Sequence, residues 1–229
     1  MTAGEILRQM AESFAAKGCP GAPFAVTFEI DSGAETWQLS AAPTDATVES
    51  GAHPEPDFTV VTSTDVLRQL QAGEISPLTA AGRESLQQKT PLDFRLPEGA
   101  SFTMDLYHRI VRFVQRFMNP APGERIRMAE THSRVVHGGN VVGLFADTGF
   151  RSGWYKLKPG ERLNEPGDTN PFPQAFVILS GSGKAQIGDE TIELRPNTAY
   201  HIPPETEHVV QPSPEEPITL LWLAWGDGA

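Results

Sequence analysis

The sequence predicts two domains of different classes, an α+β domain over residues 1–120 and an all-β barrel domain over residues 121–229. Three observations predict this division. Helix and strand patterns are mixed in the first part, whereas short and evenly spaced strand patterns dominate the second. Glycine and proline together make up 41 of the 229 residues (21 and 20), which favours many turns over long helical bundles. Between the two parts lies Asn119-Pro120-Ala121-Pro122-Gly123-Glu124, which suits neither helix nor sheet and places the boundary near residue 120.

Capping residues predict the helices of the first part. Thr2 and Glu5 form a capping-box pattern that opens an amphipathic helix. Glycine is expected to end three of the helices, because it adopts the left-handed backbone that follows a helix. The expected helices run from Thr2 to Gly18, from Thr64 (as the cap) to Gly73, from Ser76 to Gly82, and from Ser101 or Thr103 to residue 118.

Alternation of apolar and polar residues predicts the strands of the first part. Phe24, Val26, Phe28 and Ile30 alternate with more polar residues, which is the period of a half-buried strand. The expected strands are 24–30, a second one with Trp37 and Leu39 facing inward, 46–49, 58–61 and 91–96.

The second part is predicted to form strands joined by short turns. The expected strands are 141–145, 152–157, 175–179, 184–187, 191–194, 199–202, 208–211 and 218–225. Short strands at regular spacing favour a closed or double-sheet antiparallel barrel.

Charge and composition exclude several classes of function. The net charge is −11, and neither part has a basic excess: 9 basic residues face 15 acidic ones in residues 1–120, and 9 face 14 in residues 121–229. Nucleic-acid binding is therefore not expected. The single cysteine, Cys19, excludes a disulfide framework. The helix pattern from Met1 to Ala16 differs from a signal peptide, and the longest near-apolar run, Ile218 to Trp225, is too short for a membrane span. We expect a cytoplasmic protein without an integral membrane segment.

The last helix of the first part carries a wide apolar face, which has two interpretations. Leu106, Ile110, Phe113 and Phe117 form one stripe, and further apolar residues lie beside it. Core packing is the simpler interpretation. The alternative is that the additional apolar surface lines a cavity for an apolar ligand.

A family resemblance bears on this alternative. Asp57-Phe58-Thr59-Val60-Val61 is followed by Asp65-Val66-Leu67 and then by Gly73-Glu74-Ile75-Ser76-Pro77. This order resembles the sterol-carrier-protein (non-specific lipid-transfer) domain over roughly residues 5–118. The resemblance implies a five-stranded sheet with helices and a tunnel for a lipid-like chain. The tunnel positions that it implies are Val26, Phe28, Trp37, Phe58, Val60, Leu70, Phe94, Leu106, Ile110 and Phe113.

Three passages of the second part resemble a cupin domain. They are Lys158-Pro159-Gly160, the segment from Gln174 to Gly183, and the segment from His201 to His208. The resemblance implies a jelly-roll barrel (double-stranded β-helix) over about residues 140–226. In active cupins it also implies a divalent metal held by two histidines, a glutamate and a later histidine. Three imidazoles and one carboxylate suit a first-row metal.

Most of those ligand positions are occupied by other residues in this chain. The paired histidines correspond to Asp168 and Asn170, the glutamate corresponds to Gln174, and only His208 is retained. Neutral amides are weak metal ligands, so this set does not favour a bound metal. In a shifted alignment, Glu165 or Glu161 would face the pocket instead. A divalent metal at Asp168 and His208 remains the one cofactor that the pattern leaves open.

Two functions follow from these patterns. The first is a binding protein for a lipid-like or other apolar small molecule, whose degenerate cupin domain serves in ligand sensing or dimerisation. In this function Asn170, Gln174, Tyr200 and His208 present hydrogen-bonding groups to a small ligand inside the barrel. The alternative is a metal-dependent cupin oxygenase, isomerase or hydrolase that acts on an apolar substrate. A structural dimer with two ligand-free domains is a third interpretation. We also expect a homodimer formed through the second domain, because Ile218 to Trp225 is an apolar strand that would be a liability if it were exposed.

Overall fold

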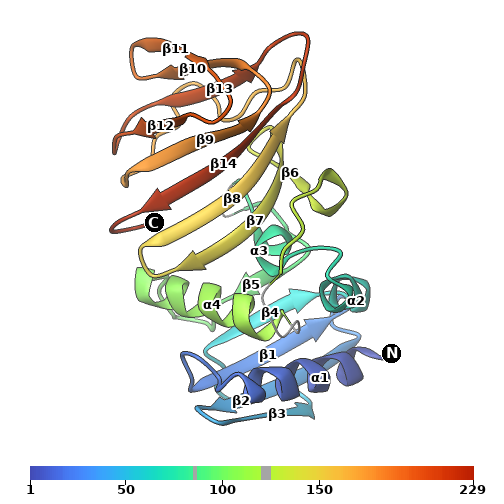
Figure 1. Cartoon of the computed structure of the whole chain (residues 1–229). Coiled ribbons are helices and arrows are strands. Elements are labelled where there is room, and N and C mark those ends of the chain that lie inside the picture. Colours follow the sequence, from blue (N-terminus) through green and yellow to red (C-terminus); the bar gives the residue numbers. More distant parts are fainter. Residues whose placement is uncertain (85–86, 120–124) are drawn as a thin grey trace. The chain divides into compact units, whose positions relative to one another are not determined.

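The computed structural model describes residues 1–84, 87–119 and 125–229, and the chain divides into two compact units, Met1–Arg127 (unit 1) and Met128–Ala229 (unit 2) (Figure 1). The boundary predicted near residue 120 lies outside the described residues.

Unit 1 is an α+β fold with a five-stranded sheet, as expected. The strand order is β3-β2-β1-β4-β5, in which β1 and β4 are parallel and the other pairs are antiparallel (Figure 1). Its elements are α1 (Ala3–Ala16), β1 (Phe24–Ile30), β2 (Glu35–Ala42), β3 (Asp45–Ser50), β4 (Phe58–Thr62), α2 (Thr64–Ala72), α3 (Pro77–Ala81), β5 (Asp93–Arg95) and α4 (Met104–Phe117).

Side-chain caps set the helix starts. The Thr2–Glu5 capping box is present at α1, and Thr103 rather than Ser101 caps α4. The expected cap of α2 is wrong by one residue. Ser63 is the cap, and its hydroxyl oxygen accepts a hydrogen bond from the backbone N–H of Val66 (3.2 Å). Thr64 is the first helical residue, and its hydroxyl donates to Asp31 instead.

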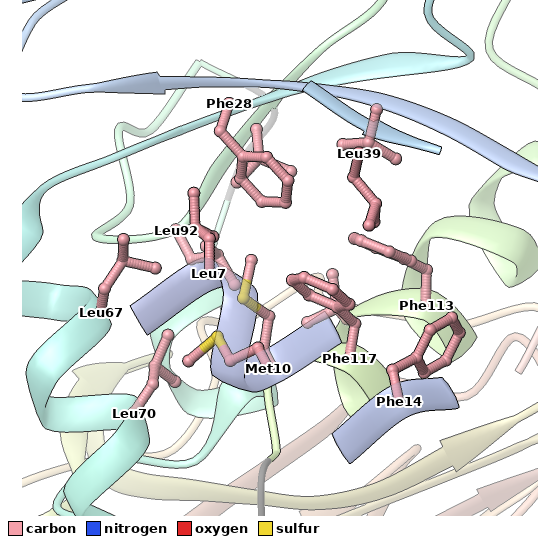
Figure 2. Close-up of a cluster of buried hydrophobic side chains, with 14 of the residues drawn as sticks. Leu7, Met10, Phe14, Phe28, Leu39, Leu67, Leu70, Leu92, Phe113 and Phe117 are labelled. Carbon is pink, nitrogen blue, oxygen red and sulfur yellow. The ribbon is translucent and has the colours of Figure 1, made fainter. Parts of the chain in front are cut away.

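Aromatic rings fill the core of unit 1. Phe113 of α4 lies in edge contact with Phe58 of β4 (centroids 5.4 Å apart) and stacks on Phe117 at 4.9 Å. Phe117 in turn stacks on Phe28 of β1, and Phe14 of α1 meets Phe117 edge-on. Figure 2 shows the rings of Phe14, Phe28, Phe113 and Phe117 converging from the sheet and the helices, with Leu and Met side chains around them. The core of unit 1 is therefore built by contacts among its own aromatic residues.

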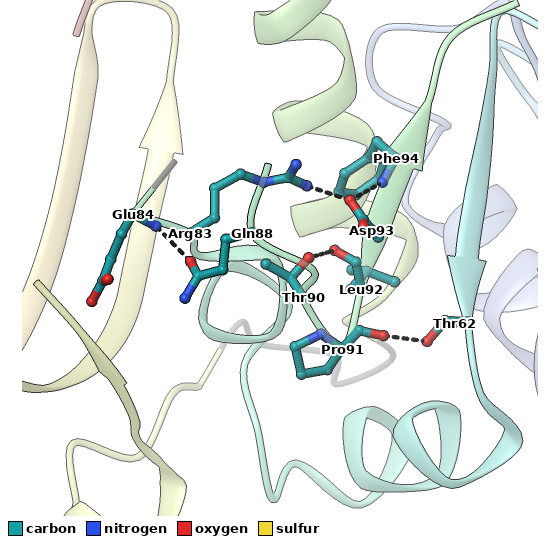
Figure 3. A network of polar contacts seen from close by, with 9 residues as sticks. All are labelled: Thr62, Arg83, Glu84, Gln88, Thr90, Pro91, Leu92, Asp93 and Phe94. Carbon is teal, nitrogen blue, oxygen red and sulfur yellow. Dashed lines mark hydrogen bonds and ion pairs between the residues drawn. The ribbon is translucent and has the colours of Figure 1, made fainter. Parts of the chain in front are cut away.

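Polar contacts hold the segment that leads into β5. The hydroxyl of Thr62 donates to the carbonyl of Pro91 (2.8 Å), and Arg83 pairs with Asp93 (2.7 Å) (Figure 3). The carboxylate of Asp93 also accepts the backbone N–H of Phe94. The strand expected over 91–96 is shorter in the structure, at 93–95, because Pro91 has no N–H and its carbonyl accepts a side-chain hydroxyl.

Unit 2 consists of two antiparallel sheets, as expected for a jelly-roll barrel. One sheet has the order β11-β10-β13 and the other β12-β9-β14-β8-β7-β6 (Figure 1). Its elements are a short 3-10 helix η1 (Glu130–His132), β6 (Arg134–Val136), β7 (Gly139–Asp147), β8 (Phe150–Leu157), β9 (Gln174–Ser180), β10 (Gly183–Ile187), β11 (Glu190–Leu194), β12 (Ala199–Ile202), β13 (His208–Pro212) and β14 (Ile218–Trp225).

The position of β14 corrects one expectation. The apolar strand would be a liability if it were exposed, but β14 lies between β9 and β8 and is paired on both sides. Its backbone groups are therefore occupied within the sheet, and only its side chains can take part in contacts with a partner.

Two glycines allow the turn between β9 and β10 to lie close to other strands. A Cβ atom at Gly181 would lie 2.0 Å from the carbonyl oxygen of Pro217, and a Cβ atom at Gly183 would lie 2.3 Å from that of Gln211. Gly181 also has a φ of +77°. No other residue fits either position without a shift of the backbone.

Candidate functional site

The interior of unit 2 has an apolar part and a polar part. Alternation along β9 directs Gln174, Phe176 and Ile178 inward, and alternation along β13 directs His208 and Val210 inward. The apolar part is one buried cluster, made of Val136, Val141, Tyr155, Leu157, Leu163, Phe176, Ile178, Ala185, Ile187, Leu194, Ile202, Val210, Ile218 and Leu220. The polar part contains Gln174 and His208, each of which is only 1% exposed.

The Gln174 amide is held in one orientation. Its oxygen Oε1 accepts a hydrogen bond from the indole Nε1 of Trp222 (2.7 Å) and another from Nδ2 of Asn170 (3.3 Å). Because an indole N–H can only donate, the amide oxygen must face Trp222. The amide nitrogen Nε2 then faces away, and it has no hydrogen-bond partner among the described residues. A buried donor without a partner is rare in proteins and costs about 1–3 kcal/mol.

The His208 ring is held in one tautomer. Its Nδ1 lies 2.9 Å from the carbonyl oxygen of Thr206, and a carbonyl can only accept, so Nδ1 carries the hydrogen. Burial lowers the pKa of the ring, an effect that the hydrogen bond to Thr206 and the charge of Asp168 partly oppose. The ring is therefore neutral at pH 7, and Nε2 is left as a hydrogen-bond acceptor. The ring centroid lies 5.9 Å from that of Phe176.

Gln174, Asn170 and Trp222 form one hydrogen-bonded group, but two other predicted site residues lie elsewhere. Asp168 is exposed, and its carboxylate accepts the backbone N–H of Glu165 (2.8 Å). The Tyr200 hydroxyl donates to the carbonyl of Glu193 (2.9 Å) and accepts the backbone N–H of Arg195 (3.0 Å). Tyr200 thus ties β12 to the end of β11, and its hydroxyl is engaged in the fold rather than presented to a ligand.

The described residues do not assemble a metal site. Within residues 1–84, 87–119 and 125–229, no three His, Cys, Asp or Glu side chains come together in a group that could hold a metal ion. The alternative from a shifted alignment also has other partners: Glu161 accepts the backbone N–H of Lys158 (2.7 Å), and Glu165 pairs with Arg162. At two of the implied ligand positions, Asn170 and Gln174 are amides that bond to each other and to the Trp222 indole, which suits hydrogen bonding rather than metal coordination.

Trp222 and Arg151 are partly buried residues of unit 2 that were not predicted as site residues from the sequence. Trp222 was part of an expected strand, and its place on the inward face follows from the alternation of β14 with Leu220. The Arg151 guanidinium lies 4.8 Å from the ring centroid of Phe172 and 5.9 Å from that of Trp222, and it donates to the carbonyl of Gly228 (3.2 Å). The alternation of β8 could have identified Arg151, because it places Arg151 on the same face of the strand as the buried Tyr155.

The ten tunnel positions implied for unit 1 lie in or against its core. Seven of them are buried members of the core cluster, namely Val26, Phe28, Phe58, Val60, Leu70, Ile110 and Phe113. The other three, Trp37, Phe94 and Leu106, are partly buried against it. These side chains contact one another, so an acyl chain would have to displace packed rings. Lipid binding stays a prediction.

An open hollow on unit 1, of about 630 Å³, is a weaker candidate. It is lined by Met1, Thr2, Ala3, Glu5, Asp31, Glu35, Thr64, Asp65 and Arg68. Hydrogen bonds from Thr2 lower the pKa of Glu5, and hydrogen bonds from Thr64 lower the pKa of Asp31. Both carboxylates therefore serve the starts of α1 and α2.

In the described part of the chain, no helix is both long and apolar enough to cross a membrane.

Comparisons with known proteins concern unit 2. No curated protein matches the chain. Similar solved structures include the plu4264 protein from Photorhabdus luminescens (17% identity, 44% of this chain and 87% of that chain, TM-score 0.41) and the cupin-2 domain protein Rru_A2000 from Rhodospirillum rubrum (18%, 40% and 62%, 0.36). The Schizosaccharomyces pombe Cnp3 cupin domain is similar as well (16%, 41% and 69%, 0.37). Similarity at this level says nothing about ligand or activity.

A family model adds to the geometry. The model described as "Cupin domain" matches residues 153–224, which span the strands from β8 to β14. No finding shows a sterol-carrier-protein domain in unit 1. The C-terminal part of this chain carries a cupin domain.

Proposed function

We propose that this protein binds a small organic molecule inside its cupin domain and acts as a sensor or carrier rather than as an enzyme. The observation that carries the proposal is the amide nitrogen of Gln174, which is buried, fixed in direction and without a hydrogen-bond partner among the described residues. An acceptor atom on a ligand would satisfy this donor and recover the cost of its burial.

The chemistry of the site favours binding over catalysis. Metal-dependent oxygenases and isomerases need open coordination positions on a held metal. Gln174 and Asn170 stand where the cupin resemblance implies a glutamate and a histidine, and their amides bond to each other and to Trp222. The side chains that would hold a metal are therefore used for a neutral hydrogen-bonded group. The wider proposal, an apolar ligand in unit 1 and a homodimer, stays a prediction and is tested separately.

A screen of small neutral compounds by thermal shift on the full chain tests this proposal. The matched pair of variants is Gln174→Leu, at the buried amide, and Gln211→Leu, at an exposed position of β13. We expect compounds that stabilise the wild type and Gln211→Leu but not Gln174→Leu. A screen in which every stabilising compound acts equally on Gln174→Leu would overturn the proposal, and so would one without any stabilising compound.

A further inference from the structure

The fixed orientations of Gln174 and His208 define which hydrogen bonds a ligand in the barrel can make. Gln174 offers a donor at Nε2, because its oxygen is used by Trp222 and Asn170. His208 offers an acceptor at its own Nε2, because its Nδ1 is used by Thr206, and no described residue bonds the remaining nitrogen. The protein therefore presents one donor and one acceptor, and neither can reverse its role while the surrounding bonds persist.

Phe176 connects the two groups. It lies two residues after Gln174 on the same inward face of β9, and its ring lies 5.9 Å from that of His208. Alternate residues of a strand are about 7 Å apart and point to the same side, so Gln174 is the neighbour of Phe176 on the inward face of β9. A ligand that reaches both groups lies against an aromatic surface, which favours a flat or cyclic apolar body.

The carboxylates that act on His208 through their charge, Asp168 and Glu207, are not buried with it. Asp168 is exposed and bonded to the backbone of Glu165. The guanidinium of Arg151 lies over Phe172 and Trp222 and donates to Gly228. A charged ligand would lose its hydration without gaining an opposite charge, which is costly in a buried site. The ligand that matches is uncharged.

We infer that the barrel recognises an uncharged ring that carries a hydrogen-bond acceptor and a hydrogen-bond donor side by side, as a lactam, a cyclic imide or a cyclic urea does. The ligand carbonyl accepts from Nε2 of Gln174, and the ligand N–H donates to Nε2 of His208. This inference rests on the proposed binding function and specifies its ligand class.

Three ring compounds of similar size test the inference on the full chain. 2-Piperidone has both groups, N-methyl-2-piperidone lacks the donor, and cyclohexanone has only the carbonyl. Binding is followed by NMR of the Gln174 side-chain NH₂ signal, which is assigned by its loss in Gln174→Glu. That variant keeps an oxygen for Trp222 and Asn170 and, in its ionised form, has no free donor. We expect 2-piperidone to shift the signal and to bind about tenfold more tightly than the other two, which is the effect of one hydrogen bond.

Variants separate the two contacts. Gln174→Glu and His208→Phe are each expected to weaken 2-piperidone binding by about tenfold, whereas Gln211→Glu on the exposed face of β13 leaves it unchanged. Equal binding of all three compounds at Gln174 would overturn the donor–acceptor inference and leave the binding function intact. A Gln174 signal that none of them shifts, and that shows contact only with water, would also overturn the inference. The thermal-shift screen decides independently whether the binding function itself stands.

Discussion

The indole Nε1 of Trp222 donates a 2.7 Å hydrogen bond to Oε1 of Gln174, and this bond determines which way a buried amide faces. The two residues lie on neighbouring strands, where Ala224 of β14 pairs with Gln174 of β9.

The first prediction concerns the stability of the amide group. Gln174→Leu removes the acceptor for Trp222 and Asn170, and we expect it to lower the free energy of unfolding by about 1–3 kcal/mol. Gln174→Glu keeps an acceptor but places an ionisable carboxyl group at a position that is 1% exposed, so we expect it to be destabilising as well. Urea denaturation measures both, and Gln211→Leu should stay within about 0.5 kcal/mol of the wild type. If Gln174→Leu lowers the free energy of unfolding by the same amount in wild type and in Trp222→Phe, the hydrogen bond between the two residues does not contribute to stability.

The second prediction concerns metal. Two amides and one imidazole compete poorly with water for first-row metals, so protein purified without chelator should hold well under one equivalent of Fe, Mn, Ni or Zn. Elemental analysis of the wild type and His208→Ala measures this. The combined Asp168→His, Asn170→His and Gln174→Glu substitutions restore the ligand set implied by the cupin resemblance and serve as the positive control. Stoichiometric metal in the wild type, lost in His208→Ala, would favour the enzyme alternative.

The third prediction concerns an acyl ligand in unit 1. If the apolar face of α4 borders a lipid tunnel, the full chain should take up a fluorescent acyl probe in a saturable way. Phe113→Asp should abolish uptake and lower the free energy of unfolding by more than about 3 kcal/mol, because it buries a charge among Phe58, Phe117 and their neighbours. Absence of uptake by the folded wild type would contradict the tunnel, whatever the variant does.

The fourth prediction concerns assembly. Sedimentation at micromolar concentration should give a species of twice 24.9 kDa. Leu179 and Trp225 project from β9 and β14 with 40% and 38% of their surface exposed. Leu179→Lys should weaken the dimer, and Gln211→Lys on the other sheet should not. A wild type that sediments only as a monomer would remove the hypothesis.

The fifth prediction concerns alkaline pH. Burial raises the pKa of Tyr155 to about 12, although the charge of Arg151 opposes the shift. The unfolded chain ionises this group near pH 10, so its contribution to stability is complete below pH 10 and is lost as the pH rises through about 12. At about pH 11 the loss is about 1.4 kcal/mol. Urea denaturation of the wild type should show this loss relative to Tyr155→Phe, and parallel pH profiles would contradict it.

Periodicity in the sequence predicted the strands and their faces well. The alternation of β1 and β9 depends on side chains close in sequence, and so does the Thr2–Glu5 capping box. The class of both units could therefore be predicted. The cap of α2 was predicted one residue late because Ser63 and Thr64 are both good caps, and the choice depends on Asp31, which lies far away in sequence.

The candidate site was predicted only in part. The cupin resemblance brought Gln174, Asn170 and His208 to attention, because its spacing is local to two segments. The partners of these residues come from other strands, so neither the Trp222 bond nor the engagement of the Tyr200 hydroxyl by β11 could be predicted from the sequence. Orientation of a buried amide is a tertiary property, and it determined the ligand class inferred here.

The close approach of Gly181 and Gly183 to the carbonyls of Pro217 and Gln211 has a consequence for aligning related sequences. Any chain that keeps this backbone must keep glycine at both places, so the pair is a reliable reference point in an alignment. Counting back along β9 from that point identifies the residue equivalent to Gln174. A glutamate there would supply the one carboxylate of the ligand set that the cupin resemblance implies, and a glutamine would mark a relative that shares the amide. Two glycines without side chains thus allow sequences to be sorted by the chemistry of their barrels.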